Sequence, residues 1–269
     1  MDHQQRIEAH KAEVRKNVWI ELRKVAMPDS RFHYDFSSFI ADFKASIHAI
    51  ERITHLEVYK TAKYVFITPD NCLQDLRYRA LRDKKHVIVT TYAIRRGFVV
   101  LHPFVLESQH CNLEYASTLD GMERVGNLVS LHYLRNRLSQ KIMLMVTGTG
   151  ALNMLGIRYG KGHGFFDLEW GMLYSIGCID LNTPVITVAH DCQVIEDDGV
   201  RVDVFDTVSD YIATRTRLIE VKNAMKPAAG ILWNRLQDGM LESIPPLQEL
   251  KDWQLRKAKA NSTDLRDDP

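Results

Sequence analysis

The sequence predicts an α/β fold with a mostly parallel sheet and helices on both of its faces. Four short segments are apolar at consecutive positions, as is typical of strands that are buried on both sides. Segments with helical periodicity alternate with them, and no internal repeat or long Gly/Ser/Pro linker divides the chain. We therefore expect a single domain over residues 1–253 and a flexible tail over residues 254–269, where the apolar face is lost.

Length and composition are those of a globular protein that can bury a sizeable core. The chain has 269 residues, 45% of them hydrophobic, and its 35 basic and 34 acidic residues give a formal net charge of +1. This balance provides no global field that would recruit nucleic acid or an anionic membrane, so an anion site must be local. The four cysteines form no CxxC pair, and the sequence contains no apolar leader or span, so we expect a cytoplasmic protein without a zinc site.

The first predicted elements are helical. Apolar residues at helical spacing indicate an amphipathic helix over about residues 7–25, which Pro28 ends. An aromatic-rich connector follows over residues 32–43 and leads into a second helix over about residues 42–54.

After these helices, the spacing of apolar residues changes from a helical pattern to the continuous apolar runs of buried strands. Residues 63–69 are predicted as a strand that a proline closes, and residues 86–91 as a second strand. Between them, Asn71 is placed to cap a helix that continues to about Arg82.

The second half of the chain predicts a β-loop-α-β unit. Strands over residues 141–147 and 184–189 flank a helix over about residues 165–176, which Gly177 ends. In open α/β folds, ligands bind at the carboxyl ends of the strands. The loop before this helix should therefore open onto a ligand site.

That loop has the composition of an anion-binding site. Gly160, Gly162 and Gly164 occupy alternate positions, so backbone N–H groups can turn toward a ligand, and the following helix adds the positive end of its dipole. Two cations, Arg158 and Lys161, lie in the same stretch. For the glycines alone, a mobile surface turn is the competing interpretation.

The loop matches neither of two familiar phosphate-binding motifs. A Walker loop needs Ser or Thr after Gly-Lys, whereas Lys161 is followed by Gly162. The dinucleotide motif needs glycine at its sixth position, which is Phe165 here.

The motif instead resembles that of a known family. Residues 160–167, Gly-Lys-Gly-His-Gly-Phe-Phe-Asp, are similar to the Gly-x-Gly-x-Gly-Tyr-Tyr-Asp signature of 5-formyltetrahydrofolate cyclo-ligases. The likeness spans roughly residues 9–220 and is closest to the branch of methenyltetrahydrofolate synthase domain-containing proteins. The further tracts that match in order are Lys11 with Arg15, residues 183–194, Asp206, residues 209–214, Lys226 with Pro227, residues 230–231 and Trp233.

The resemblance implies a three-layer α/β fold and a Mg-ATP reaction on a reduced folate. In that family's reaction, the γ-phosphate of ATP passes to the formyl oxygen at N5, and the N10 amine attacks the activated carbon. Loss of phosphate then leaves 5,10-methenyltetrahydrofolate and ADP. An amide-like oxygen leaves poorly, so its phosphorylation makes the ring closure possible, and catalysis is mostly positioning and charge neutralisation.

The resemblance also assigns roles to residues. Arg158 and Lys161 would be catalytic, and Asp167 and Asp206 would hold Mg²⁺, which prefers one or two carboxylates together with phosphate oxygens. ATP would be bound by Lys11, Arg15, Arg158, Gly160, Lys161, Gly162, His163, Gly164, Phe165, Phe166 and Asp167.

Several of these assignments have plain alternatives. Lys11 and Arg15 could lie on a solvated helix face, and Asp167 could simply be an acid in the first turn of a helix. Phe165 and Phe166 could pack in the hydrophobic core or against the adenine ring of ATP. For the second metal ligand, Asp203 and Asp210 compete with Asp206.

Two other polar groups have both a functional and a plain interpretation. His190, Asp191 and Gln193 end a buried strand at the expected ligand edge, and there they could equally form structural hydrogen bonds. Arg95 and Arg96 follow another strand and could bind the folate, or could be surface cations.

The chain departs from the cyclo-ligase pattern mainly where the folate would bind. Phe165 and Phe166 replace a tyrosine pair, Leu168 replaces an arginine, and only Asp70 is available as the acid that follows the first sheet strand. Nucleotide binding is thus better supported than cyclisation of formylfolate. A paralogue that uses ATP on another compound of cofactor metabolism, and a non-catalytic nucleotide- or folate-binding protein, remain the alternatives.

Overall fold

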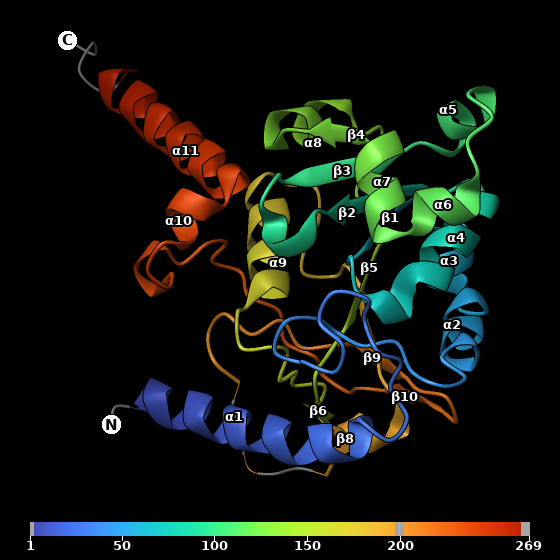
Figure 1. Cartoon of the computed structure of the whole chain (residues 1–269). Coiled ribbons are helices and arrows are strands. Elements are labelled where there is room, and N and C mark those ends of the chain that lie inside the picture. The colour runs from blue at the N-terminus through green and yellow to red at the C-terminus, as the bar shows by residue number, and fades with distance from the viewer. Residues whose placement is uncertain (1–2, 197–198, 200–201, 265–269) are drawn as a thin grey trace.

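An eight-stranded sheet forms the centre of the computed structural model, which describes residues 3–196, 199 and 202–264 (Figure 1). Its strands, in spatial order, are β10 (Leu218–Glu220), β9 (Tyr211–Ala213), β7 (Val185–Val188), β5 (Leu144–Gly148), β1 (Tyr64–Ile67), β2 (His86–Thr90), β3 (Phe98–Leu101) and β4 (Asn127–Val129).

The middle of the sheet is parallel and its edges are antiparallel. Strands β9, β7, β5, β1 and β2 pair in parallel, whereas β10, β3 and β4 run antiparallel to their neighbours. The four strands predicted from the sequence are β1, β2, β5 and β7, which are adjacent in the sheet. The prediction of a mostly parallel α/β sheet is therefore confirmed, although it did not include β3, β4, β9 and β10.

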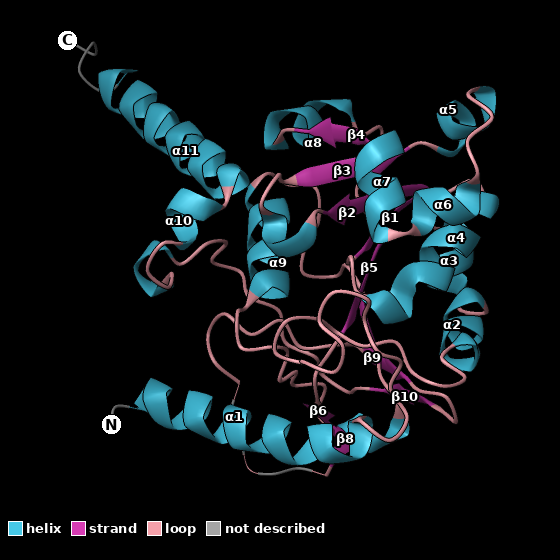
Figure 2. Ribbon diagram, in the orientation of Figure 1, coloured by secondary structure: helices cyan, strands magenta, loops and turns pink. Residues whose placement is uncertain are grey.

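Helices cover both faces of this sheet, as Figure 2 shows. Side chains alternate along each strand, so that Val65 and Ile67 of β1 join one apolar cluster and Phe66 joins the other. The helices on the first face are α2 (Ile47–Thr54), α3 (Glu57–Thr61), α4 (Gln74–Arg82), α5 (Pro103–Ser108), α6 (Leu113–Ser117) and α7 (Leu119–Val125). Those on the second face are α8 (Leu131–Arg137), α9 (Phe165–Ser175), α10 (Met240–Ser243) and α11 (Pro245–Asp264).

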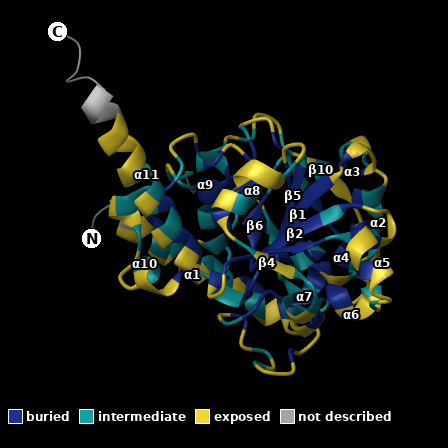
Figure 3. Cartoon of the chain, turned by 90° about the horizontal axis from the view of Figure 1, so that it is seen from above, coloured by how far each residue is buried: buried dark blue, intermediate teal, exposed yellow. Residues whose placement is uncertain are grey.

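This arrangement is the predicted three-layer fold. Figure 3 shows the strands as a buried centre with exposed residues on the surrounding helices. Among the described residues, no helix is both long and apolar enough to span a membrane.

The N-terminal helix α1 (His3–Leu22) packs outside the main sheet, beside a small second sheet. Val18 of α1 contacts Ala151 and Tyr159, which flank the parallel pair β6 (Leu152–Asn153) and β8 (Val194–Ile195). Short 3-10 helices complete the chain at residues 71–73, 92–94, 191–193 and 233–235. The helix thus lies against the segment that leads into the glycine loop.

The central β-loop-α-β unit has the predicted form. Strands β5 and β7 are parallel neighbours, and α9 connects them after the glycine loop. Gly177 has φ +76°, its N–H donates to the Tyr174 carbonyl, and the Cys178 N–H donates to Leu173. These two bonds end the helix in a Schellman motif, for which glycine is the favoured residue.

Two predicted details of the helices are wrong. Helix α2 begins at Ile47 rather than near Asp42, because the Met27 N–H donates to the Asp42 carbonyl and Lys44 pairs back to Val25. Asn71 does not cap a helix, since its side chain donates to Asp29 at 2.8 Å. Residues 71–73 form a 3-10 turn, and α4 starts at Gln74.

The last helix continues through the region predicted as a tail. Residues 254–264 belong to α11, which projects from the body in Figure 1, and residues 265–269 lie outside the described residues. Their flexibility therefore stays a prediction.

One fully buried cation fixes the loop that follows β1. Arg77 of α4 is 0% exposed, and its guanidinium donates to the carbonyls of Thr68 at 2.6 Å, Asp70 at 3.1 Å and Ser117 at 2.9 Å. Burial lowers the pKa of Arg77 to about 10, which leaves the side chain charged at neutral pH. The residues that follow β1 are thereby held at the carboxyl edge of the sheet.

Replacing this cation should destabilise the protein strongly. In Arg77→Met the three buried carbonyls lose their donor, so we expect the free energy of unfolding in urea to fall by about 3–5 kcal/mol. Arg79→Met, which removes a half-buried pair with Asp75 one turn away, is the matched control and should cost less than about 0.5 kcal/mol. Similar losses in both variants would contradict the role assigned to Arg77.

Candidate active site

A cavity of about 240 Å³ opens at the carboxyl edge of the parallel strands. The ends of β1, β2 and β5 contribute to its lining, together with α1, the glycine loop and a C-terminal segment. All the site residues predicted from the sequence line this one cavity: Lys11, Arg15, Arg158, Gly160, Lys161, Gly162, His163, Gly164, Phe165, Phe166, Asp167 and Asp206.

The glycine loop needs its glycines at two positions. Gly162 has φ +96° and Gly164 has φ +66°, a backbone region that side chains disfavour. A Cβ atom at residue 162 would also lie 3.2 Å from a terminal nitrogen of Arg15. The guanidinium of α1 therefore packs directly against the loop, and Gly164 is the residue from which α9 starts.

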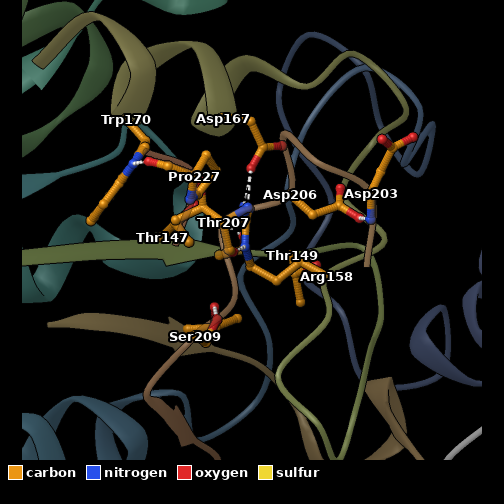
Figure 4. A network of polar contacts seen from close by, with 12 residues as sticks. Thr147, Thr149, Arg158, Asp167, Trp170, Asp203, Asp206, Thr207, Ser209 and Pro227 are labelled. Atoms are coloured by element: carbon orange, nitrogen blue, oxygen red, sulfur yellow. Dashed lines mark hydrogen bonds and ion pairs between the residues drawn. The ribbon is translucent and has the colours of Figure 1, made fainter. Parts of the chain in front are cut away.

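Two ion pairs tie distant segments together beside the loop. Lys11 donates to both carboxylate oxygens of Asp206, at 2.9 and 2.8 Å, and Arg158 donates to Asp167 Oδ1 at 2.8 Å. Figure 4 shows Asp167 also accepting the Thr207 N–H at 2.9 Å, so Arg158 and Thr207 both bind Oδ1. Burial raises the pKa of Asp167, and the charge of Arg158 opposes that shift.

Two further cations reach the cavity without an acidic partner. In the described part of the chain, neither Arg15 nor Lys161 forms an ion pair within 4.0 Å. Lys161 Nζ lies 5.5 Å from the centre of the Tyr92 ring and 3.4 Å from the Ser38 carbonyl. Burial lowers the pKa of Lys161 and of Arg15, as expected for charges that lack a counter-ion. The cavity therefore has positive charge available for a ligand.

The aromatic residues of the loop have different surroundings. Phe166 is buried beneath the Arg158 guanidinium, which lies 4.3 Å from its ring centre. Phe165 is half-buried, and its ring is 5.4 Å from that of His163. Phe166 thus packs in the core, while His163 and Phe165 are more exposed members of the cavity lining.

The floor of the cavity carries two carboxyl groups. Asp70 accepts the Gly148 N–H at 2.8 Å and the Thr68 hydroxyl at 2.5 Å. Glu169 of α9 is 2% exposed and accepts a short hydrogen bond from the Thr90 hydroxyl. Burial raises the pKa of Glu169 to about 8, with a contribution from the charge of Asp70.

Glu169 is the site residue that the sequence interpretation missed. Its signal was available, because it is an acid in an otherwise apolar helix turn, with Trp170 and Met172 close behind it. An acid two residues from Asp167 nevertheless has the pattern of an ordinary helix-surface residue.

Other polar residues considered from the sequence lie elsewhere. Gln193 donates to the Thr149 carbonyl at 2.7 Å, and Asp191 accepts from Thr214 at 2.7 Å, so that group forms structural hydrogen bonds. Arg96 pairs with Glu123 at 3.1 Å on the surface. None of His190, Asp191, Gln193, Arg95 and Arg96 lines the cavity.

The acidic residues suit a magnesium ion that arrives with a nucleotide. Within the described residues, no group of three or more His, Cys, Asp or Glu side chains could hold a metal by itself. Mg²⁺ bound to phosphates needs only one or two carboxylates. Asp167 directs its two hydrogen bonds to Oδ1, which leaves Oδ2 for a metal, whereas Lys11 holds both oxygens of Asp206.

A mostly parallel sheet with a glycine loop and several cations at its carboxyl edge is an arrangement typical of α/β proteins with an anion site at that edge. Residues 7–215 match the family model of the 5-formyltetrahydrofolate cyclo-ligase family. The chain belongs to this family, which is one of ligases.

Curated relatives share its sequence over almost its whole length. The methenyltetrahydrofolate synthase domain-containing protein of Mus musculus is 30% identical over 260 residues, covering 96% of this chain and 67% of that protein. The Homo sapiens protein of the same name is 31% identical, covering 90% of this chain and 61% of its own length. The chain thus spans about two thirds of the length of these relatives.

Among solved structures, the chain is similar to the NMR structure of Aquifex aeolicus 5,10-methenyltetrahydrofolate synthetase. The match has a TM-score of 0.48 and 17% identity, and it covers 80% of this chain and 95% of that one. The likeness is too distant to inform the arrangement of the site.

Glu169 should make stability depend on pH. Its pKa is about 8 in the folded protein against 4.5 unfolded, so the folded state binds more protons between these values. The stabilisation is fully present below pH 4.5 and is lost as pH rises toward 8. Relative to Glu169→Gln, the wild-type free energy of unfolding in urea should fall by on the order of 2–4 kcal/mol across this range. A difference that stays constant with pH would mean that the buried carboxyl is ionised throughout.

Proposed function

We propose that the protein catalyses the ATP- and Mg²⁺-dependent cyclisation of 5-formyltetrahydrofolate to 5,10-methenyltetrahydrofolate, with release of ADP and phosphate. The observation that carries this proposal is the meeting of Arg15 and Lys161, two cations without acidic partners among the described residues, with the glycine loop in one cavity. Membership of the cyclo-ligase family supports the choice of reaction.

The glycine-loop side of the cavity is suited to the nucleotide phosphates. The positive φ angles of Gly162 and Gly164 turn the backbone in the way that phosphate-binding loops require, and α9 begins at the same place. Arg15 packs against the loop and can reach a phosphate there. The phosphates of a nucleotide would thus supply the negative charge that these cations lack in the described residues.

Charge neutralisation is the main task of the residues around the transferred phosphoryl group. Lys161 and Arg158 would bind its oxygens, and burial of Lys161 strengthens that interaction because water screens it less. Asp167 orients Arg158 through their ion pair. Mg²⁺, when bound with ATP beside Asp167, would neutralise further phosphate charge. Asp206, the second proposed ligand, would have to give up its pair with Lys11 to join it.

The polar floor is suited to the second substrate. Asp70, Thr90 and Glu169 follow or cover the ends of adjacent strands, below the loop that carries Lys161. A neutral Glu169 can donate a hydrogen bond as well as accept one, which matches the mixed donors and acceptors of a reduced pteridine. The reacting formyl group would then lie between this floor and the phosphate.

A second candidate is an ATP-dependent reaction on a different substrate of cofactor metabolism. The observation in its favour is that Asp70, the acid expected to contact folate, already accepts hydrogen bonds from Thr68 and Gly148. Because Asp70 already has these partners, the floor of the cavity could bind a substrate whose polar groups differ from those of formylfolate.

Incubation of the purified protein with Mg-ATP and 5-formyltetrahydrofolate should produce the methenyl chromophore, which absorbs in the near ultraviolet, together with ADP. Both products are expected in equal amounts. ATP binding without any chromophore would reject the cyclo-ligase reaction in favour of the second candidate, and absence of ATP binding would reject both.

Lys161→Met should lower kcat for this reaction by about 10²–10³-fold, because a cation aimed at the transferred group is lost. Lys60→Met, at an exposed lysine paired with Glu57 on α3, is the matched control and should leave the rate unchanged. Equal rates for wild type and Lys161→Met would exclude Lys161 from catalysis.

A further inference from the structure

A C-terminal segment completes the cavity, although it lies beyond residues 7–215, which match the family model. The family match ends at residue 215, whereas the cavity lining continues in the segment 227–240. Its lining residues are Pro227, Gly230, Ile231, Leu232, Arg235, Leu236, Gln237 and Met240.

The first half of this segment is fixed against α9. Trp170 donates its ring N–H to the Pro227 carbonyl at 3.0 Å, a bond that Figure 4 shows. Gly230 has φ +67°, and a Cβ atom there would lie 2.4 Å from the Ser175 hydroxyl. At Gly171, a Cβ atom would lie 2.7 Å from Ile231. The chain therefore enters the cavity wall at a defined place.

The second half is fixed at two other points. The Trp233 ring N–H donates to Gln254 of α11 at 3.0 Å, and the Gln237 side chain donates to the Gly162 carbonyl at 3.4 Å. Arg235 lies between these two contacts and is thus held near the glycine loop.

Arg235 is the cation of the segment, and it differs from most cations of the cavity. Lys11, Arg31 and Arg158 each pair with an aspartate. In the described part of the chain, the side chain of Arg235 forms neither an ion pair nor a hydrogen bond that would neutralise or orient it. Its charge at the cavity wall remains available for an anionic ligand.

We propose that Arg235 binds an anionic oxygen group, a phosphate or a carboxylate, of a ligand held in the cavity. An arginine fork suits both groups, because it can donate two parallel hydrogen bonds to their oxygens. Arg235 is a specificity-determining residue, and it selects ligands that carry negative charge at this wall. The inference rests on the proposed function in taking Mg-ATP and 5-formyltetrahydrofolate as the ligands.

The test compares the dissociation constants of both ligands, measured separately by titration calorimetry, for wild type and three variants. Arg235→Leu should raise the dissociation constant of one of the two ligands by about 10-fold or more, and Arg235→Lys should recover part of the lost affinity. Arg256→Leu, at an exposed arginine of α11 outside the cavity, should bind both ligands like wild type. Equal melting temperatures of the variants would show that folding is unaffected.

The outcomes separate this inference from the proposed function. If Arg235→Leu weakens the binding of ATP, the partner of Arg235 is a phosphate. If it weakens the binding of the folate, the partner is a carboxylate. Unchanged affinities for both ligands in Arg235→Leu would overturn the inference while the proposed function stands. If wild type binds ATP but no folate, the proposed substrate is wrong, and the ATP titration still decides the role of Arg235. If wild type binds neither ligand, both proposals fail.

Discussion

The site depends on the pairing of buried opposite charges. Lys11 with Asp206 and Arg158 with Asp167 join four segments: α1, the glycine loop, α9 and the loop before β9. A buried charge without a partner costs several kcal/mol, so neither member of a pair can leave without the other. These pairs contribute less to net stability than to geometry, because their desolvation cost offsets much of their attraction. The Lys11–Asp206 pair fixes α1, which packs outside the main sheet, beside the cavity at the carboxyl edge.

The same pairing determines where ligand charge can be accepted. Lys11, Arg31 and Arg158 each have an aspartate partner, whereas Arg15, Lys161 and Arg235 reach the cavity without acidic partners in the described residues. The near-neutral net charge of the chain therefore conceals a local excess of positive charge at one edge of the sheet. The polar floor around Glu169 belongs to the same cavity, so one cavity offers a positively charged part and a hydrogen-bonding part.

Much of this architecture could be predicted because its signals are local in sequence. The inner strands are continuous apolar runs, and the glycine loop with its cations spans only a few residues, so both stand out in sequence. Arg77, Glu169 and Arg235 were missed, because each resembles an ordinary helix or surface charge in sequence, and only tertiary packing buries it or places it at the cavity wall. The strands β4, β9 and β10 have only three residues each, too few for a clear pattern, and the start of α2 is determined by pairing with residues near Val25.

The separation of Lys11 and Asp206 along the chain, 195 residues, has a consequence for how the protein is made. Synthesis proceeds from the N-terminus, so α1 emerges long before the aspartate that neutralises its lysine. Contacts between such distant residues are the ones that slow folding, because a large loop must close first. During translation Lys11 therefore has no aspartate partner until residue 206 has been made. The carboxyl edge of the sheet can be completed only when most of the chain has left the ribosome.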